Sequence, residues 1–116
     1  MKKLVKSFKY AFEGLRHCVR YGRNFKLHIL AKVLVIGAAF WFRVSMLSMA
    51  LLLVAITLVI AAEMINTAIE NAVDLFTDKS HPLAKTAKDA AAGAVLVTAV
   101  CAVCMGIIVV MMEVQR

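Results

Sequence analysis

The sequence has little of what a soluble domain uses to turn its chain and to stay dissolved. Only 1 proline, 5 glycines and 7 acidic residues occur among its 116 positions. No charged residue occurs in two long stretches, residues 44–62 and residues 90–112. With 63% hydrophobic residues as well, the composition excludes an ordinary soluble protein. The length allows one domain, residues 1–116.

The sequence also lacks the signatures of several common sites. Its 3 cysteines are too few for a disulfide framework, and Cys101 and Cys104 have no nearby histidine or further cysteine to complete a metal site. We interpret these two as small apolar packing residues. Neither the phosphate-binding loop of P-loop enzymes nor the catalytic motifs of protein kinases occur, which excludes both classes.

Three stretches are apolar enough to cross a membrane as helices, which takes about 20 residues. They cover about residues 26–43, 45–75 and 84–112, and His28 and Lys32 shorten the apolar part of the first. The sequence therefore predicts a small membrane protein with three transmembrane helices.

The N-terminal segment, residues 1–22, has two distinct faces. Apolar and basic side chains recur on opposite sides at helical spacing, which predicts an amphipathic helix lying on the membrane surface. Gly22 and Asn24 are poor helix formers, so we expect a bend before the first span. The predicted fold is thus an all-α membrane protein, a surface helix followed by three spans.

The basic residues of this chain gather on one side of the membrane. The net charge is +7, and 8 lysines and arginines lie before or at the start of the first span. The positive-inside rule places the N-terminus and residues 75–89 in the cytoplasm, and residues 43–48 and the C-terminus outside. Because these charges flank apolar spans, we expect anionic lipid headgroups or phosphates as partners, and no nucleic acid.

A polar stripe begins where the second span loses its apolar character. Its members lie at offsets of 3, 4, 7 and 11 on one helix face: Glu63, Asn66, Thr67, Glu70 and Asp74. A carboxylate near membrane depth costs about 2.5–3.5 kcal/mol, so Glu63 favours a functional interpretation. Glu70 and Asp74 have an equally good alternative, which is that they end the helix among headgroups and water.

The two glutamates of the stripe suit different roles. They lie seven residues apart, about 10 Å along a helix, which is too far to share a proton. The deeper Glu63 suits a general base, and Glu70 suits binding of Mg²⁺ together with phosphate oxygens. Lys88 and Asp89, at a similar depth, add the cation and carboxylate that phosphoryl transfer requires, although both also suit interfacial anchors. These residues alone leave the substrate open.

The amino-acid sequence of these segments resembles that of the bacterial diacylglycerol kinase/undecaprenol kinase family of small membrane kinases. The resemblance lies in EMINTAIE (residues 63–70), Asp74, HPLAKTAKDAAAGAV (residues 81–95), FKYAFEGLR (residues 8–16) and RNFKLH (residues 23–28). The HPLAKTAKDAAAGAV segment is more similar to the undecaprenol kinase branch of Gram-positive bacteria than to the diacylglycerol branch.

This resemblance implies a bacterial inner-membrane enzyme that phosphorylates a lipid alcohol with ATP and Mg²⁺. It implies a homotrimer whose active sites form between subunits, with Glu63 as the catalytic base and Glu70 as the metal ligand. The residues that it implies at the nucleotide are Tyr10, Glu70, Lys79, Ser80, His81, Lys88 and Asp89. Those in substrate-binding or supporting roles are Arg16, Asn66, Thr67 and Asp74.

One position departs from the pattern of the family. Relatives carry a glutamate, a second metal ligand, three residues before the phenylalanine that corresponds to Phe25, and this chain has Gly22. We expect weaker use of Mg²⁺, and expect Gly22→Glu to lower the Mg²⁺ needed for half-maximal rate.

Three other functions compete with phosphorylation of undecaprenol. The nearest is phosphorylation of diacylglycerol to phosphatidic acid. The second is a small transporter built around Glu63, although the acids here end the second of three spans. The third is a membrane subunit without catalytic activity, silenced by the absent glutamate at Gly22.

Overall fold

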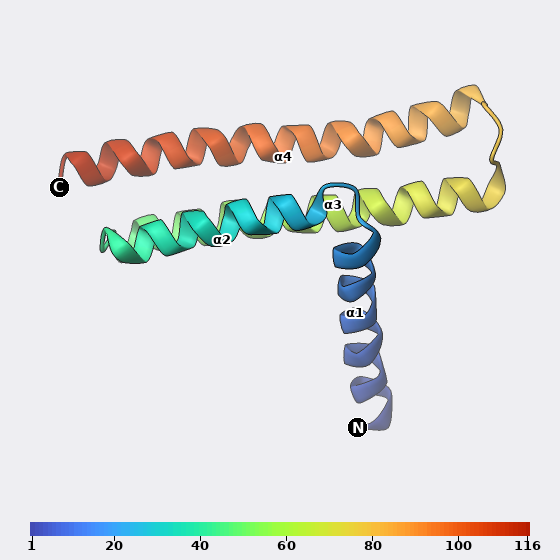
Figure 1. Ribbon diagram of the computed structural model, residues 1–116, viewed down its shortest axis with the longest axis horizontal. Helices are drawn as coiled ribbons and strands as arrows, with labels where there is room; N and C mark the ends of the chain where they lie inside the picture. The colour runs from blue at the N-terminus through green and yellow to red at the C-terminus, as the bar shows by residue number, and fades with distance from the viewer.

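The computed structural model describes residues 1–116 and consists of four helices joined by short connections, without any strand (Figure 1). The helices are α1 (Lys2–Tyr21), α2 (Phe25–Trp41), α3 (Met46–Phe76) and α4 (Pro82–Val114). The prediction of an all-α membrane protein is confirmed.

The two long helices α3 and α4 form an antiparallel hairpin (Figure 1). They contain 31 and 33 residues, or about 47–50 Å of helix at 1.5 Å per residue. Both are apolar and long enough to cross a membrane. Because a hydrocarbon core is about 30 Å thick, the hairpin extends beyond it, and its polar end can meet water.

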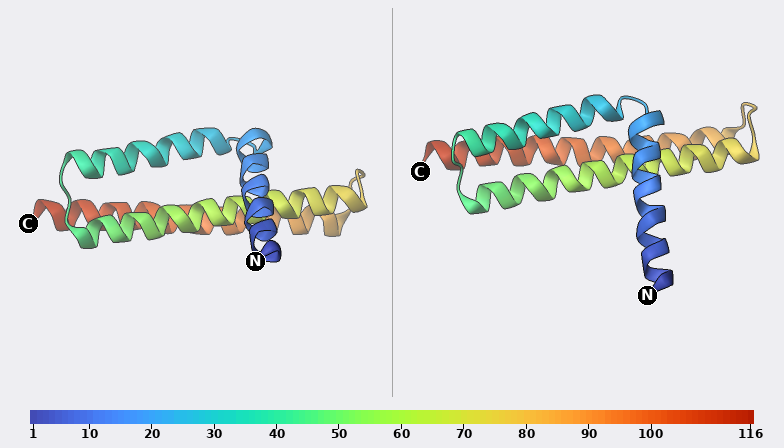
Figure 2. Two further views of the ribbon diagram at one scale, coloured as in Figure 1. Left: turned by 90° about the horizontal axis from the view of Figure 1, so that it is seen from below. Right: turned by 60° about the horizontal axis from the view of Figure 1, so that its bottom comes forward.

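The first two helices meet at a sharp bend. The angle between α1 and α2 is 103°, and α1 points away from the other helices (Figures 1 and 2). Asn24 lies in the left-handed region with φ 59°, a conformation that asparagine tolerates better than most residues. By itself α2, with 17 residues, is short for a span. Only α1 and α2 taken together have the length and the apolar composition of a membrane-spanning segment.

Helix α3 carries the packing of the hairpin. Its buried residues Leu52, Ala55, Val59 and Glu63 recur every three or four positions and therefore share one face. α4 packs along α3, and α2 packs mainly against α3. Most remaining apolar side chains are exposed, as expected of helices whose outer surfaces meet lipid or further subunits.

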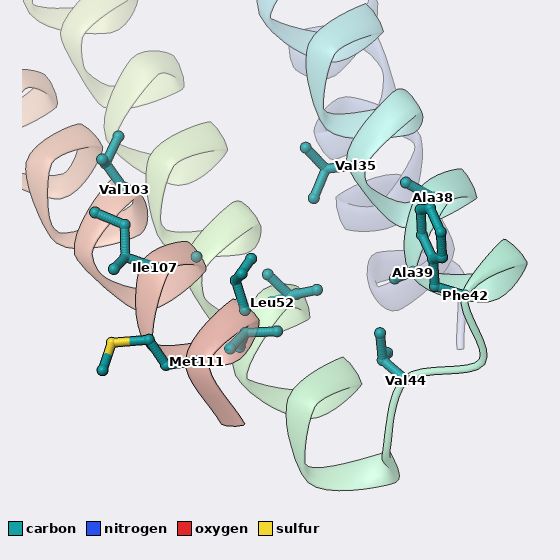
Figure 3. Close-up of a pocket in the computed structure, with 12 residues that line it drawn as sticks. Val35, Ala38, Ala39, Phe42, Val44, Leu52, Val103, Ile107 and Met111 are labelled. Carbon is teal, nitrogen blue, oxygen red and sulfur yellow. The ribbon is translucent and has the colours of Figure 1, made fainter. Parts of the chain in front are cut away.

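An apolar cavity of about 590 Å³ lies between α2 and α4, close to the 42–45 turn (Figure 3). Val35 and Phe42 line it from α2 and its end, Leu52 from α3, and Ile107 from α4. A second apolar cavity of about 520 Å³ shares Val35 and Leu52 with the first and continues toward the start of α2. Together the two cavities form an apolar groove along α2.

A hydrogen-bonded clamp closes the hairpin at the end where α3 begins. Ser45 donates its backbone N–H, and Ser48 its hydroxyl, to Glu113 Oε1 at 2.9 and 2.5 Å. Ser48 is fully buried, and Arg116 pairs with the other oxygen of Glu113 at 3.4 Å. The clamp holds the start of α3 against the end of α4.

Candidate active site

A small polar cavity lies halfway along the hairpin, where the start of α2 meets α3 and α4. Its volume is about 210 Å³. Four of the five residues of the predicted stripe line it: Glu63, Asn66, Thr67 and Glu70. Ala92 and Val95 form the wall from α4, and their small side chains leave room beside the carboxylates. The fifth residue, Asp74, lines a different cavity.

Glu63 is the most deeply placed carboxylate of this cavity. The residue is 7% exposed, and its Oε1 forms an ion-pair contact with His28 Nδ1 from α2. Its Oε2 lies 3.6 Å from Lys32 Nζ but is buried without any hydrogen-bond partner. A buried oxygen of this kind is costly unless a donor reaches it. Glu63 therefore has one oxygen held by His28 and one without a hydrogen-bond partner.

Asn66 and Glu70 place further oxygens in the same cavity. Asn66 Nδ2 donates to Glu70 Oε1 at 3.3 Å, which leaves Asn66 Oδ1 buried without a partner. Thr67 donates its hydroxyl to the Glu63 carbonyl at 3.1 Å. No group of three acidic, histidine or cysteine side chains is assembled for a metal ion. One carboxylate and one amide oxygen fit a Mg²⁺ ion that brings its remaining ligands as phosphate and water.

A second polar cavity, of about 310 Å³, lies at the tip of the hairpin. The connection between α3 and α4 lines it with Lys79, Ser80 and His81, and the helices contribute Asp74, Lys88 and Asp89. His81 Nδ1 accepts a hydrogen bond from the Leu83 backbone N–H at 3.1 Å. This bond caps α4 and fixes the imidazole ring at the edge of the cavity.

Lys88 and Asp89, the cation and carboxylate expected at the nucleotide, pair with different partners at this tip. Lys88 Nζ lies 2.5 Å from Asp74 Oδ1 on α3. Asp89 instead pairs with Lys85, one turn earlier on α4, also at 2.5 Å. Neighbouring residues of a helix do not face each other, so Lys88 and Asp89 pair with different groups, although both line the same cavity. Lys88 joins the two helices of the hairpin.

The site residues expected on α1 lie apart from both polar cavities within one chain. Tyr10 is 62% exposed, and Arg16 lines a shallow surface depression together with His17 and Arg20. α1 approaches α3 only near its end, where Asn71 Nδ2 and His17 Nε2 are 3.5 Å apart. The structure therefore does not bring Tyr10 and Arg16 to Glu63 or Lys88.

Sequence reasoning missed three residues near Glu63. His28 and Lys32 contact its carboxylate, and Arg23 lines the polar cavity. We interpreted His28 and Lys32 as limits on the length of a span, and His28 also as part of the RNFKLH segment, but we gave neither a role at Glu63. The signal was present, because ionisable residues inside an apolar segment usually face a partner or a functional site.

The sequence of this chain matches a known protein family over most of its length. The family model for prokaryotic diacylglycerol kinase matches residues 9–110. The chain belongs to this family. The match includes every residue of the two polar cavities as well as Tyr10 and Arg16. The resemblance inferred from the motifs is thereby confirmed.

The names of individual relatives refer to two different lipids. Undecaprenol kinase of Bacillus subtilis (strain 168) is 41% identical over 109 residues, which cover 94% of this chain and 89% of the relative. Diacylglycerol kinase of Synechocystis sp. is 43% identical over 104 residues, which cover 89% of this chain but 59% of the relative. Diacylglycerol kinase of Escherichia coli (strain K12) is 32% identical over 101 residues, covering 87% and 83%.

This member of the family is therefore a lipid kinase of a bacterial membrane, and a kinase of this type uses ATP. The prediction of an enzyme is confirmed, and neither a transporter nor a subunit without activity is supported. The names of the relatives divide between undecaprenol and diacylglycerol, so they leave the lipid open.

Proposed function

We propose that this kinase transfers the γ-phosphoryl group of MgATP to undecaprenol and forms undecaprenyl phosphate. The observation that carries the reaction is the buried Oε2 of Glu63, which has no hydrogen-bond partner. The choice of lipid is supported by the 41% identity with the undecaprenol kinase of Bacillus subtilis over 94% of this chain. Diacylglycerol is the second candidate, because two of the relatives described above bear its name.

The lipid hydroxyl meets Glu63 where the polar cavity adjoins the apolar groove along α2. His28 lines both the polar cavity and the nearer part of the groove. An alcohol whose chain lies in that groove can present its hydroxyl to Glu63 Oε2. The carboxylate accepts the hydroxyl proton as the lipid oxygen attacks the γ-phosphorus, which makes Glu63 a general base.

Glu70 and Asn66 hold the metal of MgATP in this proposal. A bound Mg²⁺ would neutralise charge on the β- and γ-phosphates during transfer. The hydrogen bond from Asn66 Nδ2 orients the Glu70 carboxylate and leaves Asn66 Oδ1 available as a further oxygen. Thr67 supports the same turn through its bond to the Glu63 carbonyl.

The nucleotide occupies the cavity at the tip of the hairpin. Lys88 is the main cation for the nucleotide phosphates. When the nucleotide binds, the Lys88 ammonium leaves Asp74 and pairs with a phosphate oxygen, because the phosphates carry more negative charge than one carboxylate. Lys79, Ser80 and His81 contact the nucleotide from the connection between α3 and α4, and Asp89 contacts it from α4. On this arrangement the loop and the N-terminus face the cytoplasm, where ATP is available.

The functional unit is a homotrimer in which a neighbouring subunit completes each site. Tyr10 and Arg16 lie on α1, which leaves its own hairpin at a bend of 103°. From there they can serve the cavities of the next subunit. Further subunits also provide cover for the many exposed apolar residues of α3 and α4.

The deciding experiment is ATP-dependent phosphorylation of undecaprenol and of diacylglycerol, measured in parallel with the purified full-length chain in lipid bicelles. We expect a higher kcat/KM with undecaprenol and loss of activity toward both lipids in Glu63→Gln. A preference for diacylglycerol would replace the proposed substrate. Full activity of Glu63→Gln would remove the proposed base.

A further inference from the structure

Lys32 is a cation inside the apolar part of α2, and neither the predicted site nor the mechanism above gives it a role. Its side chain is only 14% exposed. Its ammonium nitrogen lies 3.6 Å from Glu63 Oε2, the oxygen that has no hydrogen-bond partner. The lysine forms no other ion pair.

The depth of Lys32 makes this pairing significant. A charged group removed from water stays ionised only when an opposite charge or strong hydrogen bonds compensate it. Glu63 and Lys32 compensate one another: without Lys32 the carboxylate keeps only its contact with His28, and without Glu63 the ammonium has no ion-pair partner.

The other charged groups around Glu63 do not duplicate this role. His28 contacts Oε1, and Arg23 and Glu70 line the polar cavity without an ion pair to Glu63. The facing wall of α4 is neutral, since Ala92 and Val95 form it. Lys32 is the cation directed at Oε2, the oxygen that has no hydrogen-bond partner.

Lys32 also lies on the side from which an apolar substrate would arrive. It lines the apolar cavity of about 520 Å³ together with Val35, Leu52 and Ala55. Glu63 lines the polar cavity on the other side. The ammonium is thus located at the junction between the two cavities.

We propose that Lys32 is a positioning residue that keeps Glu63 ionised and orients its Oε2 toward the hydroxyl of the lipid substrate. This inference rests on the proposed function of Glu63 as the base. During transfer the lipid O–H bond breaks and its proton passes to Oε2. The lipid oxygen bonds to the γ-phosphorus, and the bond from that phosphorus to the bridging oxygen breaks to release ADP. Lys32 keeps its own proton throughout, and its charge favours loss of the proton from Glu63 before the next turnover.

The test is the pH dependence of kcat/KM with saturating MgATP and undecaprenol in bicelles. In Lys32→Met, which keeps the length of the side chain but removes its charge, the acid limb of the profile should move to higher pH by about one unit, the lower end of the effect of a neighbouring charge. Lys32→Arg should restore the parental profile. Lys26→Met, an exposed lysine on the same helix, is the matched control and should leave the profile unchanged. An acid limb that stays in place in an active Lys32→Met would overturn the inference.

Infrared spectroscopy separates this inference from the proposed function, because it requires no turnover. The carboxylic acid band of Glu63, identified by its loss in Glu63→Gln, should persist to higher pH in Lys32→Met than in the parent. Equal titration in both proteins contradicts the role of Lys32, whatever the activity. A parent inactive on both lipids, with the expected infrared shift, contradicts the kinase mechanism and leaves the pairing intact.

A folding defect in Lys32→Met would also be informative. The double variant Lys32→Met/Glu63→Gln removes both charges, so it should recover much of the folded yield lost in the single variant. If both variants lose the same yield, the two residues do not compensate each other, and the inference fails.

Discussion

The α3–α4 hairpin carries a largely buried carboxylate in two places, and the two differ in how completely they are paired. Near the 42–45 turn, both oxygens of Glu113 have partners, from Ser45, Ser48 and Arg116. At mid-length, Glu63 Oε2 has a cation 3.6 Å away but no hydrogen-bond donor. A carboxylate with partners on both oxygens holds structure together, whereas a buried oxygen without a hydrogen-bond donor calls for an explanation such as a ligand, a water molecule or a role in catalysis. The comparison is consistent with a structural role for Glu113 and with the catalytic role proposed for Glu63.

The largest expected effect on catalysis follows from replacing Glu63, whose Oε2 has no hydrogen-bond donor. Glu63→Gln keeps the shape of the side chain but cannot accept a proton, so kcat should fall by about 10²–10⁴-fold, the usual contribution of a general base. Single-turnover phosphorylation with radiolabelled ATP measures this change. Binding of MgATP, measured by equilibrium dialysis, should stay within about twofold of the parent. Equal losses in binding and turnover would mean that Glu63 supports the nucleotide site instead.

The next effect is at the tip of the hairpin. Lys88→Met should raise the KM for ATP by about tenfold, close to the loss of one charge-assisted hydrogen bond of about 1.5 kcal/mol. Lys85→Met is the matched comparison, because Lys85 lines the same cavity one turn away but pairs along α4 with Asp89 and not across the hairpin. Its effect should be at most about twofold. Similar effects of the two variants would remove the special role of Lys88.

Much of the architecture could be predicted from the sequence, because local periodicity determines it. The helical spacing of residues 63–74 correctly grouped Glu63, Asn66, Thr67 and Glu70 on one face, and four of the five stripe residues share a cavity. The two-faced pattern of residues 1–22 and the bend after it also follow from spacing and from poor helix formers.

The contacts between helices could not be predicted in the same way. Lys88 pairs with Asp74, 14 residues away, and Glu113 bonds to Ser45 and Ser48, 68 and 65 residues away. These partners depend on the axial position of α4 relative to α3, which no local sequence pattern specifies. The pairing of Lys85 with Asp89 could be predicted from the sequence, because residues four positions apart are neighbours on the surface of any helix.

A smaller effect is expected where the family pattern is broken. The bend brings Gly22 so close to α1 that a Cβ atom there would lie 2.2 Å from the Cys18 carbonyl oxygen and 2.8 Å from Phe25 Cβ. Gly22→Glu therefore needs a local backbone shift, which the sequence-based prediction did not include. Gly22→Ala is the control, since it imposes the same shift without a carboxylate.

The comparison between these two variants isolates the metal ligand. If the added carboxylate reaches the metal of MgATP, Gly22→Glu should need several-fold less Mg²⁺ for half-maximal rate than Gly22→Ala. The measurement is a Mg²⁺ titration at constant free ATP. Identical titrations of the two variants would mean that residue 22 in this bend cannot supply a ligand.

The smallest effect on catalysis is expected at the fully paired carboxylate. Glu113→Ala leaves the Ser45 N–H and the buried Ser48 hydroxyl without their acceptor, which should cost about 1–3 kcal/mol of stability. Thermal unfolding in detergent should show a lower midpoint, while kcat/KM measured well below that midpoint stays within about twofold. Glu113→Gln keeps an acceptor oxygen and should lose less stability than Glu113→Ala. A strong loss of kcat/KM at unchanged stability would reverse the assignment, because Glu113 would then act on the reaction and the contrast with Glu63 would no longer separate structure from catalysis.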